Sequence, residues 1–160
     1  MPHITIEHVM LIPLLFTQIL VFPLAASIMT SNWADSYRET ALKDAANHLA
    51  STIQQLYLSI NRKEISAGTV TQASTLPPTI DSYPYIAVGS LSSPLDSNSS
   101  KILTLSLTLE NVGNTATANA VLGPNVLWDE ESILQSTSSD ASIEVQKFAN
   151  DTLLFSFGGD

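Results

Sequence analysis

The chain has 160 residues, 44% of them hydrophobic and 13% charged, and its net charge is −9. This length allows one domain plus an appendage, and the hydrophobic content excludes a disordered chain. Residues 69–160 carry ten acidic and two basic side chains, which disfavours a nucleic-acid partner because little here neutralises phosphates. The absence of cysteine excludes disulfides and cysteine-ligated zinc.

The first predicted element is a long N-terminal helix whose first half is uniformly apolar. Residues 9–34 contain no Asp, Glu, Lys or Arg. Residues 9–28 alone match the thickness of a bilayer's hydrocarbon core, about 30 Å, at helical rise. We expect large side chains here to contact lipid or neighbouring helices, and we define them as the polymerisation helix: Val9, Leu11, Leu14, Leu15, Phe16, Ile19, Leu20, Phe22, Leu24 and Ile28.

Two prolines interrupt this apolar run. Pro13 and Pro23 lack the amide that bonds four residues back, so the helix is predicted to bend or loosen there. Within lipid or a helical bundle, neighbouring helices and the polar Thr17 and Gln18 are expected to satisfy the freed carbonyls. A secretory signal peptide cleaved after Ala26 is a competing interpretation, although the residues before the run lack the basic charge of such a peptide.

Residues 35–61 continue the helix with a different, one-sided pattern. Apolar residues recur at spacings of three and four, which predicts an amphipathic face. Trp33 and Tyr37 mark the change between the two halves. Near Ile60 the face is expected to pack on the chain's own β domain, and toward Leu42 to meet a neighbouring molecule. We define the helix seam as Leu42, Ala46, Leu49, Ile53, Leu56 and Ile60.

The predicted domains are therefore a helical segment, residues 1–66, and a β domain, residues 69–160. Within the first, residues 9–34 form the membrane segment or filament core. A helix of about 54 residues would reach about 80 Å, more than a domain of about 90 residues covers. Most of the apolar half must therefore find its partners in lipid or in other copies of the chain.

Alternating hydrophobicity predicts strands in the second domain. Residues 101–110 and 115–122 form one expected hairpin, and residues 142–148 and 152–157 form another about Asn150 and Asp151. Pro84 demotes residues 80–88 to an edge strand or a bulge. Six or seven short strands predict an α+β chain with a small antiparallel β-sandwich of Greek-key or immunoglobulin-like plan.

Sequence motifs for chemistry are scarce. No phosphate loop, nucleophile elbow or zinc-protease motif occurs, and the three histidines form no metal-site spacing, so we expect no enzyme activity, cofactor or metal. The sequons at Asn98 and Asn150 are candidate N-glycosylation sites.

A long helix, apolar and then amphipathic, followed by a β domain resembles the type IV pilins. The Cys-free, hydroxyl-rich β domain is more similar to the archaeal branch, the adhesion pilins and archaellins. The resemblance implies a homopolymeric extracellular filament, used for adhesion or surface attachment, whose precursor sits in the membrane before an assembly machinery polymerises it. Family members often carry a glutamate at the fifth mature position. If the chain matures at His3, Glu7 occupies the fifth position and pairs with the terminal amine of the adjacent subunit during docking.

Another class of function fits the same sequence. The chain then is a single-pass membrane-anchored surface protein, or a minor pseudopilin, whose exposed β domain binds a ligand. In both interpretations the β domain lies outside the cell.

Overall fold

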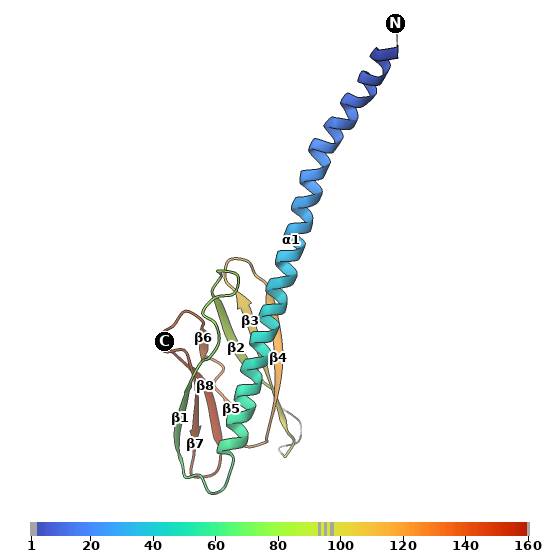
Figure 1. Cartoon of the computed structure of the whole chain (residues 1–160). Helices are drawn as coiled ribbons and strands as arrows, with labels where there is room; N and C mark the ends of the chain where they lie inside the picture. The colour runs from blue at the N-terminus through green and yellow to red at the C-terminus, as the bar shows by residue number, and fades with distance from the viewer. Residues whose placement is uncertain (1–2, 93, 95, 97, 160) are drawn as a thin grey trace. The chain divides into compact units, whose positions relative to one another are not determined.

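A computed structural model describes residues 3–92, 94, 96 and 98–159, with side-chain surroundings described from residue 11 onward except at residue 12. One helix precedes two four-stranded sheets, so the predicted α+β class with a sandwich-like arrangement is confirmed (Figure 1). The elements are α1 (His3–Ile60), β1 (Gly68–Ala73), β2 (Tyr85–Leu91), β3 (Lys101–Leu109), β4 (Thr115–Leu122), β5 (Val126–Trp128), β6 (Ile133–Gln135), β7 (Ser142–Lys147) and β8 (Leu153–Gly158).

The division into compact units differs from the predicted domains. The helix ends at Ile60, one residue before the end of the predicted amphipathic part, and the two units meet within it, between Tyr37 and Arg38. The second half of α1 belongs with the strands because it contributes buried side chains to their core. The boundary between the two units therefore coincides with the point where α1 changes from apolar on all sides to apolar on one face.

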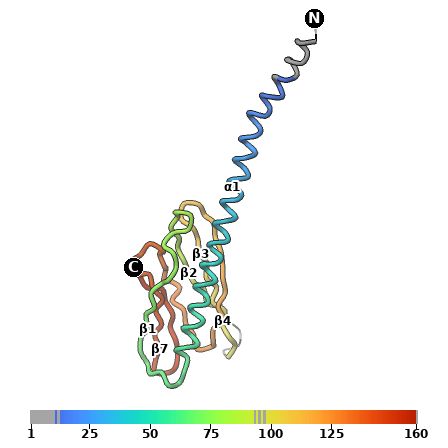
Figure 2. The backbone as a smooth tube through the Cα atoms, viewed as in Figure 1, coloured from blue at the N-terminus to red at the C-terminus, as the bar shows by residue number. Residues whose placement is uncertain are grey.

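The two sheets have the strand orders β1-β7-β8-β5 and β4-β3-β2-β6. The paired strands β1 and β7 lie side by side in Figure 2. Both predicted hairpins are confirmed, β3 with β4 and β7 with β8. All pairs are antiparallel except β5 with β8, which is parallel. Residues 126–128 and 133–135 were not expected as strands, since a strand of three residues is too short to show alternation.

Residues 80–88, expected as an edge strand or a bulge around Pro84, contain instead a strand that begins only at Tyr85 and is not at an edge. β2 pairs with β3 on one side and β6 on the other, so it lies inside its sheet. Pro84 directly precedes the first residue of β2, where its missing amide removes no ladder bond. The preceding segment makes only an isolated bridge between Ile80 and Tyr83.

One hydrophobic core joins the second half of α1 to the inner faces of both sheets. On β3 the alternate residues 103, 105, 107 and 109 are buried, and on β4 the inward positions 116, 118 and 120 are all alanine. Leu42 and Ile53 of the helix are fully buried in the same cluster. The second unit thus completes its core without using the first half of the helix.

Trp128 of β5 packs between the two sheets. Its indole lies directly over Gly89 of β2, where a Cβ atom would collide with the ring. Phe157 meets the same ring edge to face, with 5.0 Å between ring centroids. Gly89 is therefore required by close approach between the sheets rather than by backbone conformation.

Two cations hold the second half of the helix against the rest of its unit. Lys147 of β7 is only 5% exposed, and its Nζ donates to the carbonyl oxygens of Ile60 at 3.2 Å and Arg62 at 2.7 Å. The carbonyl of Ile60 is one of the acceptors left open where α1 ends, whereas that of Arg62 also accepts the backbone amide of Ile65. At the start of the second unit, Nε of Arg38 donates to Oδ2 of Asp81 at 2.7 Å, and the guanidinium lies 5.1 Å from the ring centroid of Tyr83.

We expect Gly89→Ala to lower the free energy of unfolding by about 1–3 kcal/mol, because the added methyl forces the buried indole of Trp128 to move. Gly68→Ala is the matched control, since a Cβ there meets no atom within 4 Å, and it should change stability by less than about 0.5 kcal/mol. Denaturation of the full chain in mild detergent, followed by Trp128 fluorescence with Trp33 replaced by Phe, measures both. Equal stabilities would contradict this packing.

Lys147→Met should cost about 1–3 kcal/mol, because the carbonyls of Ile60 and Arg62 lose a charged donor that no methionine replaces. Lys63→Met, at an exposed lysine, serves as the control and should be nearly neutral. The same denaturation assay applies. If both lysines prove equally dispensable, Lys147 does not fasten the end of the helix.

Candidate assembly and membrane segment

The first half of α1 exposes large apolar side chains on every side. Their exposed fractions run from 51% at Leu15 to 77% at Phe22. Because successive residues on a helix are separated by about 100°, the adjacent residues 14–16 and 19–22 cannot share one face. The apolar surface therefore surrounds the helix. Its exposed members are Leu11, Leu14, Leu15, Phe16, Ile19, Leu20, Val21, Phe22, Leu24, Ile28, Met29, Trp33 and Tyr37.

Nine of the ten residues predicted for the polymerisation helix are among these exposed side chains. The side chain of the tenth, Val9, lies outside the described part of the chain, as does that of Glu7. The docking role of Glu7 therefore stays a prediction. Val21 and Met29 belong to the same surface and were left out of the predicted set, although the uncharged run already contained them.

Hydroxyl groups within this segment bond to the helix itself. Oγ1 of Thr17 donates to the carbonyl of Pro13 at 2.8 Å, and Oγ1 of Thr30 to that of Ala26 at 2.9 Å. Oγ of Ser31 donates to the carbonyl of Ser27 at 3.0 Å. A hydroxyl with its proton already donated loses less on leaving water. These residues therefore do not oppose transfer of the segment into an apolar environment.

The helix continues through both prolines. Pro13 leaves the carbonyl of Val9 without a donor, and Thr17 was expected to compensate for a proline in this way. That expectation is wrong in its detail, because the hydroxyl of Thr17 bonds to the carbonyl of Pro13 itself. A threonine in a helix reaches the carbonyl four residues before it, and for Thr17 that residue is Pro13.

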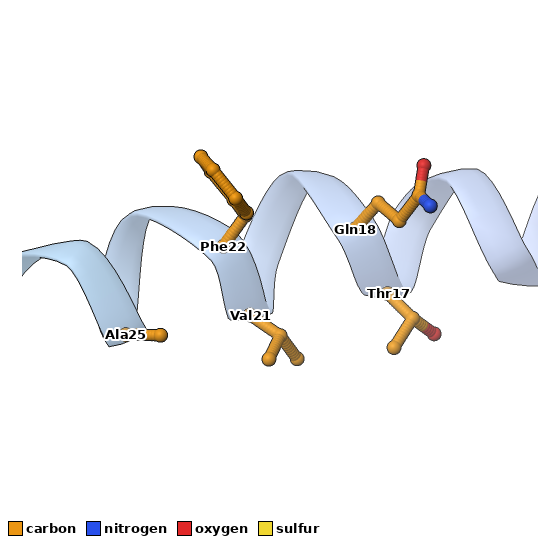
Figure 3. Close-up of a pocket in the computed structure, with 5 residues that line it drawn as sticks. All are labelled: Thr17, Gln18, Val21, Phe22 and Ala25. Atoms are coloured by element: carbon orange, nitrogen blue, oxygen red, sulfur yellow. The ribbon is translucent and has the colours of Figure 1, made fainter.

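Side chains four residues apart form rows along the helix. Figure 3 shows Thr17, Val21 and Ala25 in one row and Gln18 and Phe22 in another, and these five residues line a shallow groove. Rows at a spacing of four are the ridges that interdigitate when two helices pack. Small residues in such a row allow another helix to come close.

The helix seam lies in the second unit and not in this segment. Leu42, Ala46, Leu49, Ile53 and Ile60 are buried, and Leu56 is partly buried against the same core. The expectation that the seam meets a neighbouring molecule toward Leu42 is wrong, because Leu42 is 0% exposed within its own unit. Ala45 and Ala50 are buried beside the seam, so the apolar stripe is wider than the spacing of three and four indicated.

Both sequons are accessible. Asn98 and Asn150 are exposed, and Oδ1 of Asn150 accepts the backbone amide of Thr152 at 3.2 Å. Their glycosylation stays a prediction. Among the residues that the structure describes, no group of three or more His, Cys, Asp or Glu side chains is placed to hold a metal ion.

By length and composition, α1 between Pro13 and Ile60 contains a stretch apolar enough to cross a membrane, and none of that stretch is buried among the described residues. No protein-family model, curated protein or solved structure matches the chain.

Proposed function

We propose that the chain is the structural subunit of an extracellular helical filament of the archaeal type IV pilus kind, polymerised through the first half of α1 and used for adhesion or surface attachment. The observation that supports this most is the contrast between the two units. The second completes a hydrophobic core, whereas the first leaves thirteen large apolar side chains more than half exposed.

The energetic argument starts from these exposed side chains. Burying one such side chain fully is worth about 1.5–3 kcal/mol, so the set amounts to on the order of 20 kcal/mol or more. An isolated chain in water cannot retain that surface. A bilayer covers it first, and copies of the same helix cover it after assembly.

Transfer from lipid to a bundle of helices gains little from hydrophobicity, because both surroundings are apolar. Close packing must then drive assembly, and Ala25, Ala26 and Ser27 provide small side chains for it. Contacts between unlike surfaces of identical subunits repeat without closing and build a helical polymer. The pilus assembly machinery would extract the helix from the membrane, and the acidic β domains, glycosylated or not, would face the medium.

The membrane-anchored alternative uses the same segment but requires only its insertion in the bilayer, without assembly. A single-pass surface protein or minor pseudopilin keeps its helix in lipid, and its β domain binds a ligand. The two functions differ in whether a second copy of the helix replaces the lipid, so a test must disturb helix packing without disturbing membrane insertion.

Ala25→Leu meets this requirement, because leucine is more apolar than alanine and yet prevents close approach of another helix. Overpacking costs about 1–3 kcal/mol per contact, so we expect the yield of filaments to fall at least about tenfold while the precursor stays in the membrane fraction. Electron microscopy of sheared cell-surface appendages counts the filaments, and membrane fractionation follows the precursor.

Leu24→Met is the matched control at the adjacent position, since it conserves volume and should leave the filament yield unchanged. Unaltered filaments in Ala25→Leu would show that close helix packing does not drive assembly. If the unaltered chain forms no filaments and remains in membranes, the anchored alternative replaces the filament.

A further inference from the structure

We propose that Trp33 and Tyr37 hold the membrane-inserted precursor at the boundary between hydrocarbon and water, so that the lipid-buried stretch ends at Asn32. This inference rests on the membrane stage of the proposed function. The two rings stack on each other with 6.1 Å between centroids and an angle of 21° between planes. Trp33 is 72% exposed and Tyr37 55% exposed, so a large aromatic surface is available to a surrounding medium.

The place of this pair in the sequence indicates which medium. No Asp, Glu, Lys or Arg occurs from His8 to Ala34, and Asp35 and Arg38 then follow within four residues. The uncharged run of 27 residues reaches about 40 Å at helical rise, so a hydrocarbon core of about 30 Å that ends at Asn32 fits within it. The aromatic pair lies at the end of this run, among the first charges.

The chemistry of the two rings suits that depth. An indole or phenol presents an apolar body and one polar tip, which is why tryptophan and tyrosine concentrate at membrane interfaces. Thr30 and Ser31 precede the pair with hydroxyls already bonded to the helix, so they can lie within hydrocarbon up to the same boundary. The exposed amide of Asn32 comes next, where the end of the span lets it reach the hydrated headgroups.

The surroundings of the helix at this depth are mixed. Successive residues are separated by about 100°, so Asp35 lies on the opposite side of the helix from the two rings. In the headgroup region the rings leave water while the side around Asp35 stays hydrated, and the charges that end the uncharged run favour lipid headgroups as the cover for these rings.

Fluorescence of Trp33 tests the depth directly, because the chain has only one other tryptophan. Trp128→Phe removes that second signal, and it sacrifices no hydrogen bond, since Nε1 of Trp128 has no partner among the described residues. The full-length variant is reconstituted in phosphatidylcholine vesicles that carry bromine either near the headgroup end or near the methyl end of the acyl chain. Bromine quenches only fluorophores at its own depth.

We expect Trp33 to be quenched at least about twofold more by shallow than by deep bromine, as for an interfacial ring. The matched control moves the fluorophore to another exposed position of the same helix, Phe22→Trp, with Trp33 and Trp128 replaced by Phe. That position is eleven residues earlier, about 16 Å deeper and close to the midplane, so deep bromine should quench it more.

Stronger quenching of Trp33 by deep bromine would overturn the inference, because the boundary would then lie beyond the pair. Quenching of the Phe22→Trp fluorophore with none of Trp33 would also overturn it, since the rings would then stand clear of the bilayer. If neither is quenched, the membrane stage of the proposed function fails together with the inference. If both depths are as expected and no filaments form, the inference stands and only the filament fails.

Discussion

The side chains around the first half of α1 need an apolar environment that its own unit does not provide. The helix satisfies its amides by its own hydrogen bonds, and the hydroxyls of Thr17, Thr30 and Ser31 bond to its carbonyls as well. What remains is apolar surface on every side, which water disfavours and either lipid or other helices accept. Because no single face of this segment is polar, packing one side against a domain would leave the others in water.

The second half of the same helix buries its apolar face within its own unit. Its buried stripe from Leu42 to Ile60 joins the inner faces of both sheets, while polar residues face water. Lys147 satisfies carbonyls at the end of the helix, and the ion pair of Arg38 with Asp81 lies where the second unit begins. One continuous helix thus connects a unit that is complete in water to a segment that requires another environment.

How much the sequence predicted depends on the length and regularity of each pattern. Alternation over eight or nine residues located β3 and β4, and the unbroken uncharged run located the exposed apolar segment. β5 and β6 were not predicted because three residues show no periodicity. The prediction from Pro84 was wrong because the effect of a proline depends on whether it lies inside a strand or just before it. Leu42 was assigned to a neighbouring molecule because helical periodicity identifies a buried face without identifying what covers it. The role of Glu7 depends on another molecule, which one chain's sequence cannot position.

The oligomeric state of the intact chain in buffer tests the central claim most directly. Purified full-length protein is transferred from detergent into detergent-free buffer and examined by analytical ultracentrifugation, with a parallel sample kept in detergent. We expect large assemblies or complete sedimentation without detergent, because the apolar surface of α1 must be covered by other copies. A stable, soluble monomer in plain buffer would contradict the account, because the apolar helix would then need neither lipid nor other copies of the chain to cover it.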